Sequence, residues 1–119
     1  MLPVEKTHSL TGPDALSVTL TIPPSLSWFE GHFDSQPVLP GVAQIEWAIH
    51  YAARYLNVNA AFSSLEQVKF LSPILPQDEV TLLLTWDAQL QKLQFRYHAF
   101  PSADAEPVLM SSGKIRLCP

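Results

Sequence analysis

The stretch from Phe29 to His50 reads FEGHFDSQPVLPGVAQIEWAIH, and it carries the features that decide the fold. Pro40 and Gly41 in its second half are typical of a helix start. From Gly41 to about Leu56, apolar residues recur at helical spacing, which predicts one long helix. The apolar stripe of this helix consists of Val42, Ile45, Ile49, Ala52 and Leu56.

Period-two alternation predicts strands on both sides of this helix. Before it, Ala15 to Ile22 alternates apolar and polar side chains, and Val4 to Leu10 pairs with that strand across a turn at Thr11 to Asp14. Two prolines end the hairpin, and a short helical turn follows. After the helix, the predicted strands are Ser64 to Leu71, Val80 to Trp86, Leu93 to Ala99, and Val108 to Leu117 with a bulge near Gly113. This layout predicts an α+β fold in which a curved antiparallel sheet wraps one helix.

Composition limits the classes of function. The 119 residues fit one domain spanning 1–119, and 47% hydrophobic against 15% charged residues favours association with a partner chain. A net charge of −4 and the lack of a basic run argue against nucleic-acid binding. No apolar run reaches the roughly 18 residues of a membrane span, so a cytoplasmic location is expected.

Cysteine and histidine usage argues against metal and thiol chemistry. Cys118 is the single cysteine, so no intrachain disulfide is possible. The histidines His8, His32, His50 and His98 have no ligand-like spacing. We therefore expect no metal site.

Two side chains in the opening stretch suit acid-base chemistry. His32 can accept a proton at neutral pH, because an unperturbed imidazole has a pKa of about 6.5. Glu46 falls within the apolar stripe of the helix, where burial favours the protonated, proton-donating carboxyl. Gly41 opens the helix, and its backbone N–H is available to an oxygen that gains negative charge. A base, an acid and an oxyanion donor together suit a dehydration, in which a proton α to a carbonyl is removed and a β-hydroxyl is lost.

Each of these residues also has a purely structural explanation. A single histidine in a loop is commonly a turn residue, and Glu46 could extend its stem over apolar surface or pair with His50 one turn later. Pro40 and Gly41 alone mark an ordinary helix start. The combination within one segment is what favours function.

The motifs GHF at Gly31 to Phe33 and PVLPGV at Pro37 to Val42, followed by Glu46, resemble the signature of the hotdog-fold 3-hydroxyacyl-[acyl-carrier-protein] dehydratases of the FabZ type. The separation of 14 positions between His32 and Glu46 matches the spacing of the catalytic pair in that family. A second segment, VKFLSPILPQD at Val68 to Asp78, resembles a later family motif.

The resemblance implies a hotdog fold and a specific set of roles. His32 would remove the C2 proton of a 3-hydroxyacyl thioester, and Glu46 would protonate the leaving hydroxyl. The Gly41 N–H would polarise the thioester carbonyl, the Val38 carbonyl would orient His32, and Phe33 and Phe70 would line the acyl tunnel. The family implies dimers that combine the histidine of one subunit with the acid of the other, an acyl carrier protein as partner, and no cofactor. A related hotdog subunit could replace the second copy.

The departures from the usual FabZ pattern point to a subgroup. Asp34 replaces the proline that commonly follows GHF, Gln77 replaces a glycine, and the usual N-terminal segment is missing. In these respects the chain resembles the short dehydratases of bacterial aryl-polyene biosynthesis. Two alternatives remain, a hotdog acyl thioesterase and a non-catalytic subunit of a dehydratase heterodimer.

Overall fold

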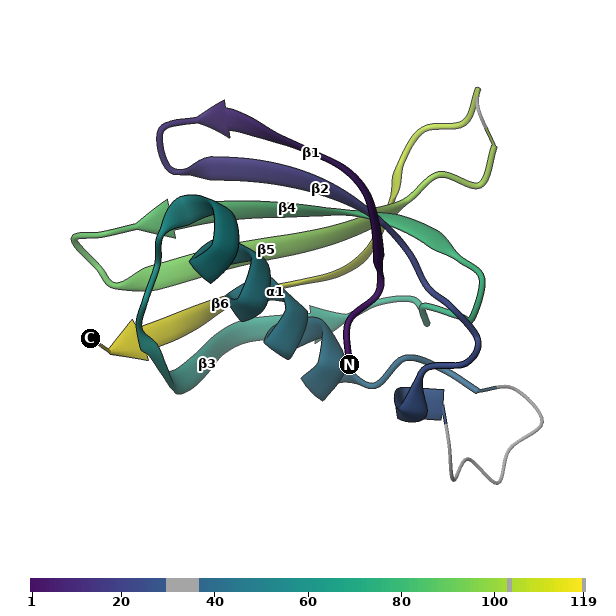
Figure 1. Cartoon of the computed structure of the whole chain (residues 1–119), viewed down its shortest axis with the longest axis horizontal. Coiled ribbons are helices and arrows are strands. Elements are labelled where there is room, and N and C mark those ends of the chain that lie inside the picture. Colours follow the sequence, from purple (N-terminus) through teal and green to yellow (C-terminus); the bar gives the residue numbers. More distant parts are fainter. Residues whose placement is uncertain (30–36, 103, 119) are drawn as a thin grey trace.

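The computed structural model describes residues 1–29, 37–102 and 104–118. In this part of the chain, six strands form one antiparallel sheet in the order β1-β2-β4-β5-β6-β3, and a single α-helix lies across one face of it (Figure 1). The elements are β1 Val4–Gly12, β2 Ala15–Thr21, the 3-10 turn η1 Ser27–Phe29, α1 Gly41–Leu56, β3 Ala61–Phe70, β4 Glu79–Asp87, β5 Lys92–Ala99 and β6 Val108–Cys118. The predicted α+β hotdog architecture is confirmed.

The helix forms where the sequence predicts it, from Gly41 to Leu56. It ends because Asn57 adopts a left-handed conformation with φ of 57°. The side of α1 that meets the sheet combines three alanines with two large aromatic side chains, and the small side chains let the helix approach the strands. These buried residues are Ala43, Gln44, Trp47, Ala48, Tyr51 and Ala52.

The core lies between α1 and the central strands. Strands β2, β4 and β5 alternate as expected, and every second side chain points toward the helix. The fully buried members include Leu16, Val18, Leu20, Leu82, Leu84, Leu93, Phe95 and Tyr97. The outward residues of the same strands are polar or only partly buried, so these strands carry the period-two pattern of a half-buried sheet.

The bulge in β6 lies at a different place from the one predicted. Tyr97 pairs with Ser111, whereas His98 pairs with Leu109, so Met110 is the extra residue. Met110 and Ser111 are consequently both buried, while Gly113 continues the regular alternation. Gly113 interrupts the apolar pattern for another reason: a Cβ there would come within 2.8 Å of Val68 and 2.9 Å of Phe95.

The N-terminal segment is held against the helix. The indole N–H groups of Trp28 and Trp47 both donate to the carbonyl oxygen of Met1, at 3.2 and 2.9 Å. Further along, the Tyr55 hydroxyl donates to the Glu5 carboxylate at 2.7 Å, and this ties β1 to the last turn of α1. Burial raises the Glu5 pKa, but hydrogen bonds from Tyr55 and His8 outweigh it and leave the pKa below its usual value. None of the described helices is long and apolar enough to cross a membrane.

Candidate active site

The N-terminal end of α1 offers free backbone donors. Pro40 precedes the helix with φ of −65° and ψ of 152°, and within the described residues no side chain caps this end. The N–H groups of Ala43 and Gln44 bond to the Pro40 carbonyl, at 3.1 and 3.4 Å. Those of Gly41 and Val42 have no partner in the described part of the chain. The first turn can therefore bind an electron-rich oxygen, aided by the helix dipole.

A groove of about 510 Å³ runs from this end along the outer side of α1, toward β3. Its walls are almost entirely apolar, and Glu46 is the single charged residue among those that line it. The lining residues are Gly41, Val42, Ile45, Glu46, Ile49, Phe62, Leu65 and Phe70. An apolar groove with one carboxyl group suits an acyl chain that carries one reacting centre.

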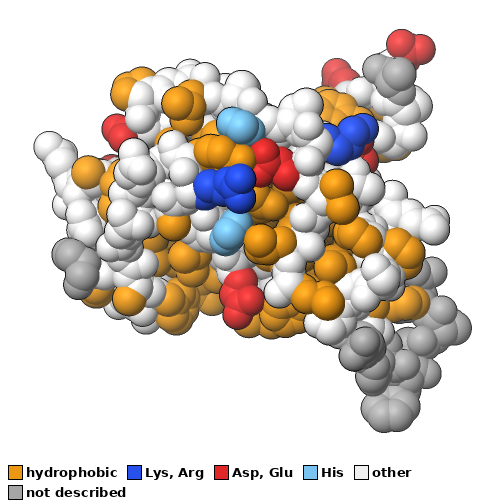
Figure 2. Space-filling view, in the orientation of Figure 1, with side chains coloured by type: hydrophobic (Ala, Val, Ile, Leu, Met, Phe, Trp, Pro, Cys, Tyr) orange, Lys and Arg blue, Asp and Glu red, His pale blue; other side chains and the backbone are white. Residues whose placement is uncertain are grey.

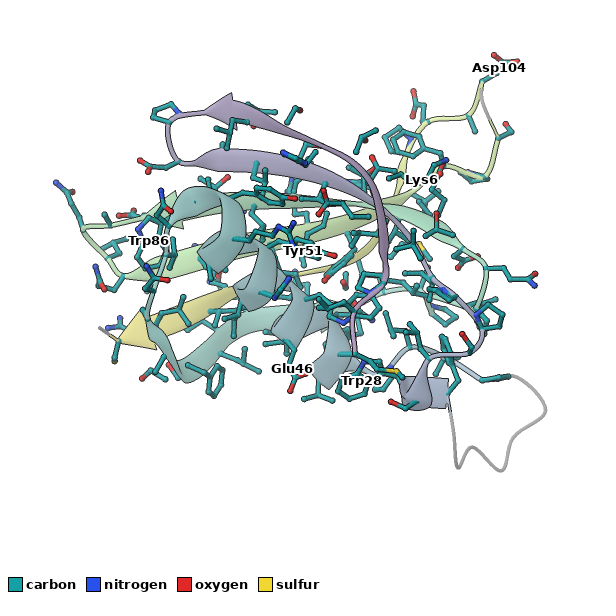
Figure 3. The ribbon with its side chains drawn as sticks, in the orientation of Figure 1. Lys6, Trp28, Glu46, Tyr51, Trp86 and Asp104 are labelled. Carbon is teal, nitrogen blue, oxygen red and sulfur yellow. The ribbon has the colours of Figure 1, made fainter. Side chains whose placement is uncertain are left out.

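Glu46 lies on the lower side of α1 in the view of Figure 3, and it lines the groove that α1 shares with β3. The helical spacing correctly places it among Val42, Ile45 and Ile49, but the expectation that it is buried is wrong for the single chain, because Glu46 is exposed. Of the apolar stripe to which it belongs, only Val42 is exposed, whereas Ile45, Ile49 and Leu56 are partly buried against the core and Ala52 is fully buried. The largest buried side chains of α1 are Trp47 and Tyr51, on its core side. The stripe therefore borders the core, and Glu46 lies beside its exposed part.

The surface around Glu46 is strongly apolar. Val42 is 56% exposed, Phe62 53% and Phe70 52%. In Figure 2, hydrophobic side chains gather over the lower part of the visible face, where α1 and β3 run. Exposed apolar surface of this kind on a small protein marks a contact site for another molecule.

Gly41 and Phe70 lie against each other. The Phe70 ring occupies the place of a Gly41 side chain, and a Cβ there would overlap the ring. The sequence predicts that the Gly41 N–H is available to a ligand, and in the structure the space beside it, where a side chain would lie, holds the exposed Phe70 ring. Phe70 lines the groove and also a neighbouring hollow of about 310 Å³, and its role as a tunnel residue stays a prediction.

The structure describes only one of the three remaining predicted site residues. Val38 is partly buried and lines the hollow beside Gly41 and Phe70. His32 and Phe33 lie outside the described residues. Within the described ranges, no three His, Cys, Asp or Glu side chains come together as metal ligands.

Sequence reasoning missed several residues near the site. Phe62 and Leu65 line the groove from β3, and the apolar residues of that strand were the available signal. His50, considered from the sequence only as a possible partner of Glu46, lies with it along a second hollow of about 320 Å³. Its Nε2 is buried without a hydrogen-bond partner in the described part of the chain. Gln44, buried in the first turn of α1, gave no sequence signal at all.

Solved structures share this arrangement of sheet and helix. A chain of the dehydratase heterocomplex ApeI:P from Xenorhabdus doucetiae superimposes with a TM-score of 0.87 at 40% identity, and the match covers 100% of both chains. An uncharacterised protein from Erwinia carotovora subsp. atroseptica gives a TM-score of 0.89 at 41% identity, covering 100% of this chain and 98% of that one. The fold and site define a hotdog-fold dehydratase.

Sequence comparison gives the family. The model of the ApeI-like family, described as ApeI dehydratase, matches residues 8–114, and the chain belongs to this family. It is also 27% identical to the 3-hydroxyacyl-[acyl-carrier-protein] dehydratase FabZ of Oenococcus oeni, over 89% of this chain and 81% of that protein. The corresponding FabZ of Novosphingobium aromaticivorans is 31% identical over 64% of this chain and 54% of that protein. The resemblance drawn from the GHF and PVLPGV motifs is confirmed.

Proposed function

We propose that this protein removes water from a 3-hydroxyacyl thioester on acyl carrier protein to give the trans-2-enoyl thioester, in fatty-acid-like or aryl-polyene biosynthesis. The observation that carries the proposal is the position of Glu46 in an apolar groove that begins at the uncapped end of α1. The proposal includes a cytoplasmic location, which the similarity to carrier-protein dehydratases supports. No cofactor is needed for this reaction.

The reaction has a role for each group. His32 takes the C2 proton, and the electron pair left at C2 is delocalised onto the thioester oxygen, which accepts a hydrogen bond from the Gly41 N–H. The C3–O bond then breaks as Glu46 donates its proton to the hydroxyl, which leaves as water. The C2 electron pair becomes the new double bond. Val38 would orient His32 through its carbonyl, and Phe33 and Phe70 would line the tunnel for the acyl chain.

We infer that a second hotdog subunit covers the groove. The exposed apolar side chains beside Glu46 and the unpaired edge of β3 need a partner, because both are unfavourable in water. Such a partner would enclose Glu46 and would place its own catalytic histidine near the Glu46 carboxyl group. The partner is another copy of the chain or a related subunit, and the similar Xenorhabdus doucetiae chain comes from a heterocomplex.

Leu65→Asp is expected to weaken this subunit contact. Leu65 is exposed on the edge strand β3 and lines the groove, so a carboxylate there would be buried by the partner without a counterion. Sedimentation of the purified protein, alone and with its hotdog partner, measures the association. The matched control is Leu10→Asp, a change at an exposed leucine on β1, the opposite edge of the sheet. Equal association of both variants would place the interface elsewhere.

Product analysis separates the proposed reaction from the alternatives. Incubation of the assembled protein with a 3-hydroxyacyl carrier protein is expected to give the enoyl thioester, detected by mass spectrometry of the carrier. Release of free acid would identify a thioesterase, whose carboxylate activates water. Absence of any conversion would favour a non-catalytic subunit. Saturated and aryl-capped substrates compared side by side would identify the acyl class.

A further inference from the structure

A buried polar cluster connects the first turn of α1 to β6. Gln44 is 3% exposed, Ser111 1% and Tyr97 0%. The Ser111 hydroxyl donates to Gln44 Oε1 at 2.6 Å, and the Tyr97 hydroxyl donates to the backbone carbonyl of Gln44, also at 2.6 Å. Burial raises the Tyr97 pKa well above its usual value, so its hydroxyl keeps the proton that it donates. These hydrogen bonds favour one arrangement of the three residues, because any other arrangement would leave a buried polar group without a partner.

The Gln44 side chain also bonds to the turn before the helix. Its Nε2 donates to the carbonyl oxygen of Leu39 at 3.4 Å. A carbonyl can only accept, so the amide nitrogen must face Leu39 and the amide oxygen must face Ser111. Loss of either contact would leave the other half of the amide poorly oriented.

The Leu39 backbone is therefore held at both of its polar groups. The Leu39 N–H donates to the Ile74 carbonyl at 2.8 Å, and its carbonyl accepts from Gln44. Only Pro40 separates this residue from Gly41, and the proline ring fixes its own φ at −65°. The ψ of Pro40, 152°, is held by the hydrogen bonds that its carbonyl accepts from the N–H groups of Ala43 and Gln44. With both dihedral angles of Pro40 held, the direction of the Gly41 N–H follows from the position of Leu39.

The bulge in β6 connects the cluster to Phe70. The extra residue Met110 turns Ser111 toward the core, and Ser111 pairs with Phe70 across the β3–β6 ladder. The Met110 carbonyl accepts the N–H groups of Leu71 and Ser72, at 2.9 and 3.1 Å, where β3 ends. The same bulge thereby places the Ser111 hydroxyl at Gln44 and the Phe70 ring at Gly41.

We propose that Gln44, supported by Ser111, is a positioning residue that aims the Gly41 N–H at the thioester oxygen of the substrate. This inference rests on the proposed function, in which negative charge develops on that oxygen as the C2 proton leaves. A donor that is displaced by about an ångström loses much of its effect on the rate, since the bond must fit the transition state. An apolar side chain at position 44 would fill the same space but would not hold Leu39.

The test compares Gln44→Met with the unchanged protein in its native assembly. The substitution keeps the size of the side chain and removes both of its hydrogen bonds. We expect kcat to fall about 10 to 100-fold, as for a misplaced oxyanion donor. Infrared spectra of a bound enoyl thioester with a ¹³C-labelled carbonyl report the hydrogen bond itself, and the lowering of the carbonyl frequency on binding should shrink in the variant. Leu16→Met, a change at a fully buried position on β2, is the control and should leave both readouts unchanged.

Ser111→Ala and Ser111→Thr complete the design. Alanine removes the hydroxyl and should reproduce part of the Gln44→Met effect, whereas threonine retains a hydroxyl and should restore the carbonyl shift. If Gln44→Met does not fold, the comparison of Ser111→Ala with Ser111→Thr tests the positioning role by itself. A normal carbonyl shift and normal kcat in both Gln44→Met and Ser111→Ala would overturn the positioning role. If the unchanged protein itself gives no carbonyl shift and no turnover, the proposed function fails, and this inference with it.

Discussion

Glu46→Gln is expected to lower the rate of dehydration by about 10² to 10⁴-fold, the usual contribution of a general acid. The amide matches the carboxyl group in size but has no acidic proton for the leaving hydroxyl. The fold should not change, because Glu46 is exposed on the outer side of α1 and makes no hydrogen bond or ion pair within the described residues. Enoyl formation on a 3-hydroxyacyl carrier protein measures the rate, and circular dichroism with a thermal melt checks the fold.

Glu66→Gln provides the matched control for this change. Glu66 lies on β3 and forms ion pairs with Lys92 at 2.8 Å and with Arg116 at 3.5 Å. It pairs in register with Lys114, on the face of the sheet away from α1. The same chemical change there should leave the rate unaltered. Full activity of Glu46→Gln would remove Glu46 from the mechanism.

His32→Ala is expected to cause a similar loss, about 10² to 10⁴-fold, because it removes the proposed general base. The more informative experiment mixes this variant with Glu46→Gln. If each site of a homodimer takes its histidine from one subunit and its acid from the other, a mixed dimer contains one intact site. After subunit exchange, random pairing would restore about one quarter of the original activity, as expected for a symmetric two-fold dimer.

Two outcomes would contradict the proposed sharing of sites between subunits or the role of His32. Mixed dimers that form but remain inactive would show that His32 and Glu46 act within one subunit. Full activity of His32→Ala alone would exclude His32 as the base. Each variant kept separate, at the same total concentration, is the control for residual rate.

The sequence by itself determined the elements and the site motif. The bounds of α1, Gly41 to Leu56, follow from the spacing of its apolar residues and from the Pro40–Gly41 start, which are local signals. The strands follow from period-two alternation for the same reason, and the hairpin of β1 and β2 from the turn residues between them. The grouping of Gly41, Glu46 and Phe70 around one groove also follows the motif.

Only the tertiary structure decided which side of α1 meets the sheet. Both sides are apolar, so periodicity could not distinguish the core side with Trp47 from the outer side with Glu46. The bulge at Met110 likewise depends on the pairing of β6 with β5, which no local pattern records. The contact between Gln44 and Ser111 joins residues 67 positions apart, and it exists because the fold brings a helix start onto a strand bulge. Local patterns fix elements, whereas side-chain environment depends on contacts between distant segments of the chain.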